Sequence, residues 1–151
     1  MKLQGKEIEV TTLPELADKE YQIAIVDTPP YIFEEFSEIV KSSDLILVPV
    51  KGSLVDSISA IQTFSELKEN GGGEKSFAIL NMSIANTSFN EEVKEMLKEA
   101  EVPFLKSQVG NRISFSRCQF KSTSIFEEKD QKAKDEIKSL ALEVYNKLLN
   151  Y

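Results

Sequence analysis

Residues 44–81 read DLILVPVKGSLVDSISAIQTFSELKENGGGEKSFAILN, and this stretch decides the class of fold. It contains two continuous apolar runs, residues 45–48 and 77–80, without the alternation of a half-exposed strand. Such runs are typical of strands covered on both faces. Between them, residues 56–68 space their apolar side chains as a helix does, and the Asn-Gly-Gly-Gly of residues 70–73 ends that helix. The order strand, helix, strand predicts an α/β fold with a parallel sheet.

The same alternation continues on both sides of this stretch. Ser88 is predicted to cap a helix and to form a capping box with Glu91. A weak alternation over residues 7–10 suits a short strand. The pattern predicts a single domain over residues 1–151, with helices on both faces of a mostly parallel sheet. The expected strands are residues 21–27, 44–49, 76–81 and 104–109; the expected helices are residues 32–42, 56–68, 88–100 and 131–149, with a loop and short helix over residues 110–119.

Composition excludes several classes of function. The chain has 151 residues, 41% hydrophobic and 28% charged, which is ordinary for a globular protein with a sizeable core. It has no histidine, which excludes Ser-His-Asp and Cys-His catalysis and His-ligated zinc. The net charge of −7 disfavours a surface that binds nucleic acid as a whole. A single cysteine, Cys118, and the lack of long apolar runs predict a reducing, cytoplasmic setting without a membrane span.

Ligands of parallel α/β sheets bind at the carboxyl ends of the strands, which directs attention to Asp27 and Asn81. A carboxylate at Asp27 suits a magnesium ion beside a nucleotide phosphate, or else a turn that closes the strand. The Asn81 amide suits an adenine edge or a turn, and the residues alone favour the turn.

Residues 71–76, GGGEKS, resemble a phosphate-binding loop only superficially. That loop reads G-x-x-x-x-G-K-[ST] and follows a strand, whereas here a helix precedes and Glu74 replaces the last glycine. We therefore expect these residues to end a helix.

The late part of the chain concentrates positive charge. Arg112 and Arg117 are the only arginines, and Lys121 follows them closely. This cluster suits a local phosphate or DNA contact, or an ordinary solvated surface.

Taken in order, these motifs resemble the ParA/MinD family of deviant-Walker ATPases, and most closely its plasmid- and chromosome-partition ParA branch. YQIAIVDTPP at residues 21–30 resembles that family's Walker B strand, and SDLILVPV at residues 43–50 its next strand. Ser53 and Asp56 are also typical of the family. The other similar segments are residues 77–82, 109–113 and 124–127.

The resemblance implies a P-loop NTPase-like fold with ATP and Mg²⁺ as cofactors. It assigns Asp27 to magnesium and its water, Asn81 to adenine, and Arg112 with Arg117 or Lys121 to DNA or dimer contacts. It also implies ATP-dependent dimerisation, non-specific DNA binding and a ParB-like centromere-binding partner.

One departure from the family is large. The loop K-G-G-x-G-K-[ST] and the second aspartate motif are missing, so the chain resembles the C-terminal two-thirds of a ParA-like protein. Because phosphoryl transfer depends on such phosphate contacts, we expect this chain alone neither to bind ATP tightly nor to hydrolyse it. A non-catalytic interaction module and an unrelated α/β domain remain alternatives. We further expect residues 7–10, or a strand from a second copy in a homodimer, to occupy the open strand edge.

Overall fold

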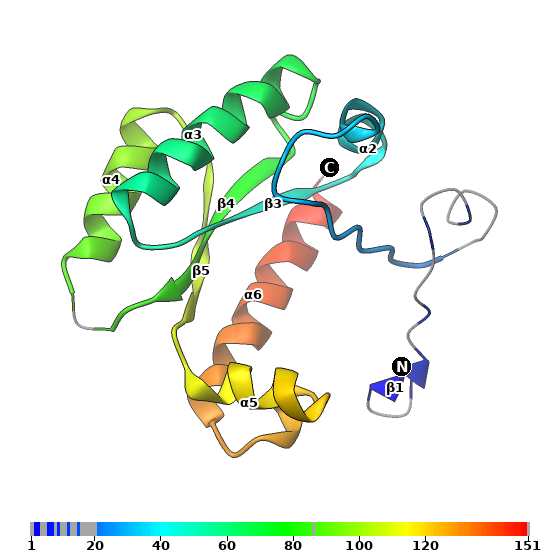
Figure 1. Cartoon of the computed structure of the whole chain (residues 1–151), viewed down its shortest axis with the longest axis vertical. Helices are drawn as coiled ribbons and strands as arrows, with labels where there is room; N and C mark the ends of the chain where they lie inside the picture. Colours follow the sequence, from blue (N-terminus) through cyan, green and yellow to red (C-terminus); the bar gives the residue numbers. More distant parts are fainter. Residues whose placement is uncertain are drawn as a thin grey trace. The chain divides into compact units, whose positions relative to one another are not determined.

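A computed structural model of the chain describes residues 2–3, 6–7, 9, 12, 15, 21–85 and 87–150 (Figure 1). The chain divides into two units, Met1–Glu34 and Glu35–Tyr151. In the first unit, β1 (Lys2–Leu3) and β2 (Lys6–Glu7) form a short antiparallel pair.

The second unit contains a parallel sheet, which confirms the predicted fold class. Its three strands are β3 (Ile46–Val50), β4 (Ser76–Ser83) and β5 (Phe104–Gly110), in the order β3-β4-β5. β4 is the central strand and is parallel to both neighbours. Its register with β3 is unbroken from Ile46↔Ser76 to Val50↔Leu80, whereas its register with β5 shifts twice.

The helices lie close to their predicted positions. In the region expected to hold a loop and a short helix over residues 110–119, a helix begins at Ile113 after the end of β5 and continues to Lys121. The last helix has the predicted bounds. The helices are α2 (Phe36–Ser42), α3 (Leu54–Glu69), α4 (Phe89–Glu99), α5 (Ile113–Lys121), the 3₁₀ helix η1 (Ile125–Glu127) and α6 (Gln131–Leu149).

Alternate side chains of β4 enter two different cores, which places helices on both faces of the sheet. Ala78 and Leu80 pack in a cluster with buried residues of α3 and α4. Phe77 and Ile79 pack in a second cluster with Leu140 and Val144 of α6. The strand is buried at five consecutive positions, which explains its continuous apolar run.

The predicted strand over residues 21–27 is wrong. The structure has no ladder in this segment, and Ile23 and Ile25 are 69% and 91% exposed. An apolar run forms a strand only where its amides meet a neighbouring strand, and no strand among the described residues of this unit pairs with the segment.

Three local predictions are also corrected. The helix expected from residue 32 begins at Phe36. Ser88 is the N-cap residue of α4, as predicted, but it forms no capping box with Glu91, because its hydroxyl donates to Glu92 Oε1. A capping box is formed instead by Ser124 and Glu127 around η1. Glu7 belongs to β2 and Glu9 lies outside any strand, while residues 8 and 10 of the strand expected over residues 7–10 lie outside the described residues.

The glycines after α3 form a helix end, as predicted. Gly71 has a φ of +83°, its amide donates to Lys68 O, and the Gly72 amide donates to Leu67 O. This pair of bonds is the Schellman motif, which needs a left-handed backbone at the first residue after the helix C-cap, here Gly71. Ser76 follows as the start of β4 and donates its hydroxyl to Gly72 O at 2.6 Å.

Alanine substitutions at these glycines should lower the free energy of unfolding by different amounts. Gly71→Ala meets no atom within 4 Å but needs a left-handed backbone, so it should cost about 1 kcal/mol of stability. Gly72→Ala should cost about 1–3 kcal/mol, because its Cβ would lie 2.9 Å from Val40 Cγ1 and 3.1 Å from Leu67 O. Urea unfolding would measure both. Gly73→Ala is the matched control, because its Cβ meets only Lys68 at ordinary contact distance; an equal loss in all three variants would contradict the assignment.

Candidate functional site

The carboxyl ends of β3, β4 and β5 form one edge of the second unit. The Asn111 amide donates to Ser83 O at 2.9 Å and ties the ends of β4 and β5 together. Next to β3, Ser53 caps α3 by accepting from the Asp56 amide at 3.0 Å, and its hydroxyl donates to the Asp56 carboxylate. The hydroxyl and carboxylate at the start of α3 are therefore engaged with each other.

Asn81 lies in β4, which continues two residues beyond it to Ser83. Its Oδ1 accepts the Met82 amide at 2.9 Å, and Met82 has a φ of +52°. A side-chain bond of this kind stabilises a left-handed residue. The Asn81 side chain therefore binds the backbone at an irregular point of β4, and the adenine assignment stays a prediction.

Asp27 lies in the first unit, on the extended and exposed segment described above. It is therefore not part of the unit that carries Asn81, Arg112, Arg117 and Lys121. The described residues contain no group of three acidic, cysteine or histidine side chains suited to holding a metal ion. Asp27 is thus not built into a metal site by its described neighbours.

Arg112 precedes α5 and is bound to Glu136 of α6 by several short contacts. Its Nη2 lies 2.6 Å from Glu136 Oε1 and its Nε lies 3.0 Å from Glu136 Oε2. The Gly110 amide also donates to Glu136 Oε2 at 3.0 Å. The hydrogen bond from Arg112 therefore lowers the pKa of Glu136; burial opposes this effect and the Gly110 amide adds to it. The same contact raises the pKa of Arg112.

A second carboxylate of α6 binds β5 one heptad further along. Glu143 Oε1 accepts the Lys106 amide and Oε2 accepts the Ser107 amide, each at 2.8 Å. These amides belong to the irregular part of β5, where residues 104 and 108 pair with residues 78 and 80. Burial raises the pKa of Glu143, but hydrogen bonds from the Ser107 hydroxyl and the two amides outweigh it, so the pKa lies below its ordinary value.

Asp130 connects the beginning of α6 to α5. Its Oδ1 accepts the Ala133 amide at 3.1 Å, and its Oδ2 accepts the Ser114 hydroxyl at 2.8 Å. The Ala133 amide is the main reason that the pKa of Asp130 lies below its ordinary value, and the Ser114 hydroxyl adds to it. These two bonds join the beginning of α6 to α5, and the Ser114 hydroxyl is buried between them.

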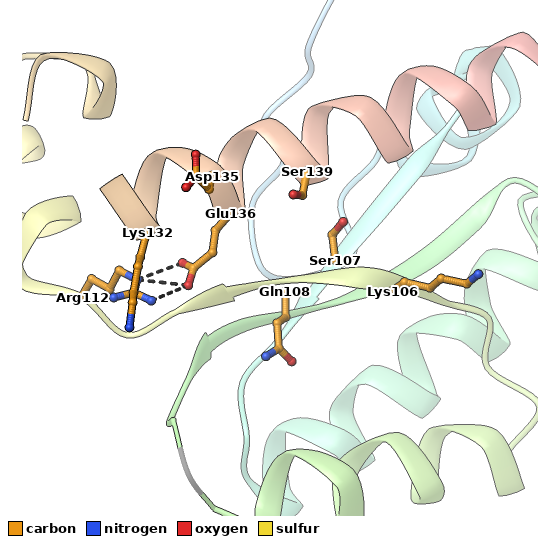
Figure 2. Close-up of a pocket in the computed structure, with 8 residues that line it drawn as sticks. All are labelled: Lys106, Ser107, Gln108, Arg112, Lys132, Asp135, Glu136 and Ser139. Atoms are coloured by element: carbon orange, nitrogen blue, oxygen red, sulfur yellow. Dashed lines mark hydrogen bonds and ion pairs between the residues drawn. The ribbon is translucent and has the colours of Figure 1, made fainter. Parts of the chain in front are cut away.

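An open depression of about 500 Å³ lies between β5 and α6 (Figure 2). Arg112 and Glu136 meet at one end of it, with the Lys132 side chain beside Arg112, while Lys106 lies at the other end. Gln108 projects from the side of β5 away from α6. The lining residues are Lys106, Ser107, Gln108, Arg112, Lys132, Asp135, Glu136 and Ser139. Glu136 neutralises Arg112 at its end of the depression.

The structure gathers the three predicted basic residues on or beside α5. Arg112 is the residue before the helix, while Arg117 lies within it and is exposed. Lys121 is the last helical residue, and its Nζ lies 3.0 Å from Glu128 Oε1. Two of the three charges are therefore paired with carboxylates, and only Arg117 has no ion pair within the described residues.

The sequence reasoning missed Glu136 and Glu143, although a signal for them was present. Both flank the apolar stripe of α6, one heptad apart, and a carboxylate beside a buried stripe needs a partner. The amides that they bind could not be foreseen, because the register of β5 beside β4 and the position of α6 are set by the tertiary structure.

Comparisons with protein-family models and with curated proteins give no match for this chain. Among the helices of the described residues, none is long and apolar enough to span a membrane.

We expect Glu136→Gln and Glu143→Gln each to lower the free energy of unfolding at pH 7 by about 1–3 kcal/mol, because each variant removes a charged acceptor of backbone amides. In the unsubstituted chain both folded pKa values lie below the ordinary 4.5, so this stabilisation is present above pH 4.5 and is lost as the pH falls further. The variants should therefore approach the unsubstituted chain in stability at low pH. Urea unfolding at a series of pH values measures the effect.

Glu95→Gln, on the exposed part of α4, is the control for these two variants because it makes the same change in net charge. If the three variants lose equal stability at pH 7, the two carboxylates do not hold α6 to β5.

Proposed function

We propose that this chain is the sheet-bearing portion of a ParA-like partition protein, with a P-loop NTPase-like fold, and that by itself it acts as a non-catalytic protein-binding module. The α/β fold with a parallel sheet supports the proposal in its coarse form. The ordered set of motifs described above supports the finer assignment.

The observation that carries the binding role is the unpaired edge of β3. Ile46 donates its amide to Lys75 O, toward β4, so alternation along the strand directs Leu47 and Pro49 to the opposite edge. No strand among the described residues pairs with that edge. Pro49 lacks an N–H and therefore blunts the edge, but the carbonyls of Leu47 and Pro49 remain available to a further strand.

We assign this edge to a strand from a second copy of the chain, in a homodimer. Residues 23–26 are apolar, extended and outside any ladder, so they are suited to supplying that strand. In a complete ParA-like protein, dimerisation would be coupled to ATP and Mg²⁺, and the further partners would be DNA and a ParB-like centromere-binding protein in the cytoplasm.

Catalysis by the chain alone is disfavoured by its sequence motifs. The segment closest to a phosphate-binding loop ends α3 with Gly71 in the left-handed region, and it precedes a strand instead of a helix. An anion-binding loop directs its amides at phosphate from the beginning of a helix. The Gly71 and Gly72 amides instead donate to carbonyls of α3.

Titration of the chain with Mg²⁺ and ATP, followed by calorimetry, should give no micromolar affinity. Asp27→Ala should leave that result unchanged, because Asp27 lacks the loop that would hold the phosphates beside it. Micromolar binding that is lost in Asp27→Ala would restore the reading of this chain as an active ATPase.

Self-association should depend on the unpaired edge of β3. Pro49→Ala adds an outward N–H and should raise the dimer fraction, whereas Leu47→Pro removes one and should lower it. Sedimentation equilibrium measures both, and circular dichroism verifies that the variants fold. Pro103→Ala is the matched control, because Pro103 precedes β5 at the other side of the sheet. A chain that remains monomeric in all forms at its highest soluble concentration would contradict the homodimer.

A further inference from the structure

The outer face of α5 combines apolar and cationic side chains. We define it as Ile113, Arg117 and Phe120, which follow each other at helical spacing along the exposed side of the helix. Ile113 is 71% exposed and Phe120 is 93% exposed. Arg117 lies between them and is also exposed.

The inner face of α5 fixes the direction of this outer face. Ser114 and Cys118 are buried, and Cys118 packs with Ile125 and Ala133 in a separate core cluster. The Ser114 hydroxyl is bound to Asp130 at the beginning of α6. Rotation of α5 to hide Phe120 would break these contacts, so the ring is held outward by the packing of the opposite face.

An almost fully exposed phenylalanine on an ordered helix differs from a scattered surface leucine. Aromatic rings and arginines are the residues enriched at the centres of protein interfaces, where a ring buries roughly 150–250 Å². The outer face presents one of each, with an aliphatic side chain beside them. This composition favours a docking surface for another macromolecule.

Charge identifies the kind of partner. The helix contains Arg117 and Lys121 and no acidic residue, in a chain whose net charge is −7. Lys121 is paired with Glu128, so Arg117 is the cationic side chain of α5 that remains available for an ion pair with a partner. Binding to DNA rests on many phosphate contacts, and the pairing of Arg112 with Glu136 and of Lys121 with Glu128 leaves too few of them here.

We propose that the outer face of α5 binds an acidic amphipathic helix of a partner protein. Apolar side chains of that helix cover Phe120 and Ile113, and a carboxylate pairs with Arg117. The proposal does not rest on the β3 edge, since α5 and β3 are separate elements and the observations that carry the two proposals are different.

The test uses the full chain and a fluorescent synthetic peptide that forms a helix with leucines along one stripe and glutamates on both flanks. A second peptide with lysines in place of the glutamates is the matched probe. Anisotropy titration should show binding of the acidic peptide only. Phe120→Ala and Arg117→Glu should each weaken it at least about tenfold. Leu142→Ala, an exposed apolar position on α6, should leave it unchanged.

Circular dichroism verifies that each variant is folded before the titrations are compared. Absence of binding, equal binding of both peptides, or full binding by Phe120→Ala or Arg117→Glu would overturn the proposal. A DNA duplex that binds the chain more tightly than the acidic peptide, through Arg117, would overturn the assignment of the partner. Monomer–dimer behaviour of the β3-edge variants is measured separately, so failure of one proposal does not decide the other.

Discussion

The second unit depends on the burial of β4 between two strands and two layers of helices. Its residues 76–80 are all buried, and its side chains alternate between the core of α3 and α4 and the core of α6. A strand in this position must satisfy its backbone on both sides, because water does not reach it. β3 and β5 supply those bonds, and the helices follow from the need to cover both faces.

The two outer edges of the sheet are completed differently. Along β5, Glu136 and Glu143 of α6 accept hydrogen bonds from backbone amides of that strand. Along the outer edge of β3, no strand among the described residues plays that role, and Pro49 removes one backbone donor. This asymmetry separates an edge used for internal packing from an edge suited to recognition of another strand.

Ion pairing determines which of the basic residues near α5 are available to bind a partner. As a sequence cluster, Arg112, Arg117 and Lys121 suggest contacts with phosphate. In the folded unit, Glu136 and Glu128 neutralise two of them, and both carboxylates come from segments that follow the helix in the chain. Binding through this region therefore depends on Arg117 and on the apolar side chains beside it, which favours a protein partner over a polyanion.

The sequence by itself determined the order of elements from residue 44 onward, the parallel sheet and the end of α3, because apolar periodicity and glycine act over a few neighbouring residues. The candidate site was only partly predictable: Asn81 was assigned correctly to a strand, but its bond to the Met82 amide was not specified. Only the tertiary structure decided that residues 21–27 form no strand and that Glu136 binds Arg112. A strand needs hydrogen bonds to a neighbouring strand, and this ion pair joins residues far apart in the chain. Neither can therefore be predicted from the local pattern of apolar and polar residues.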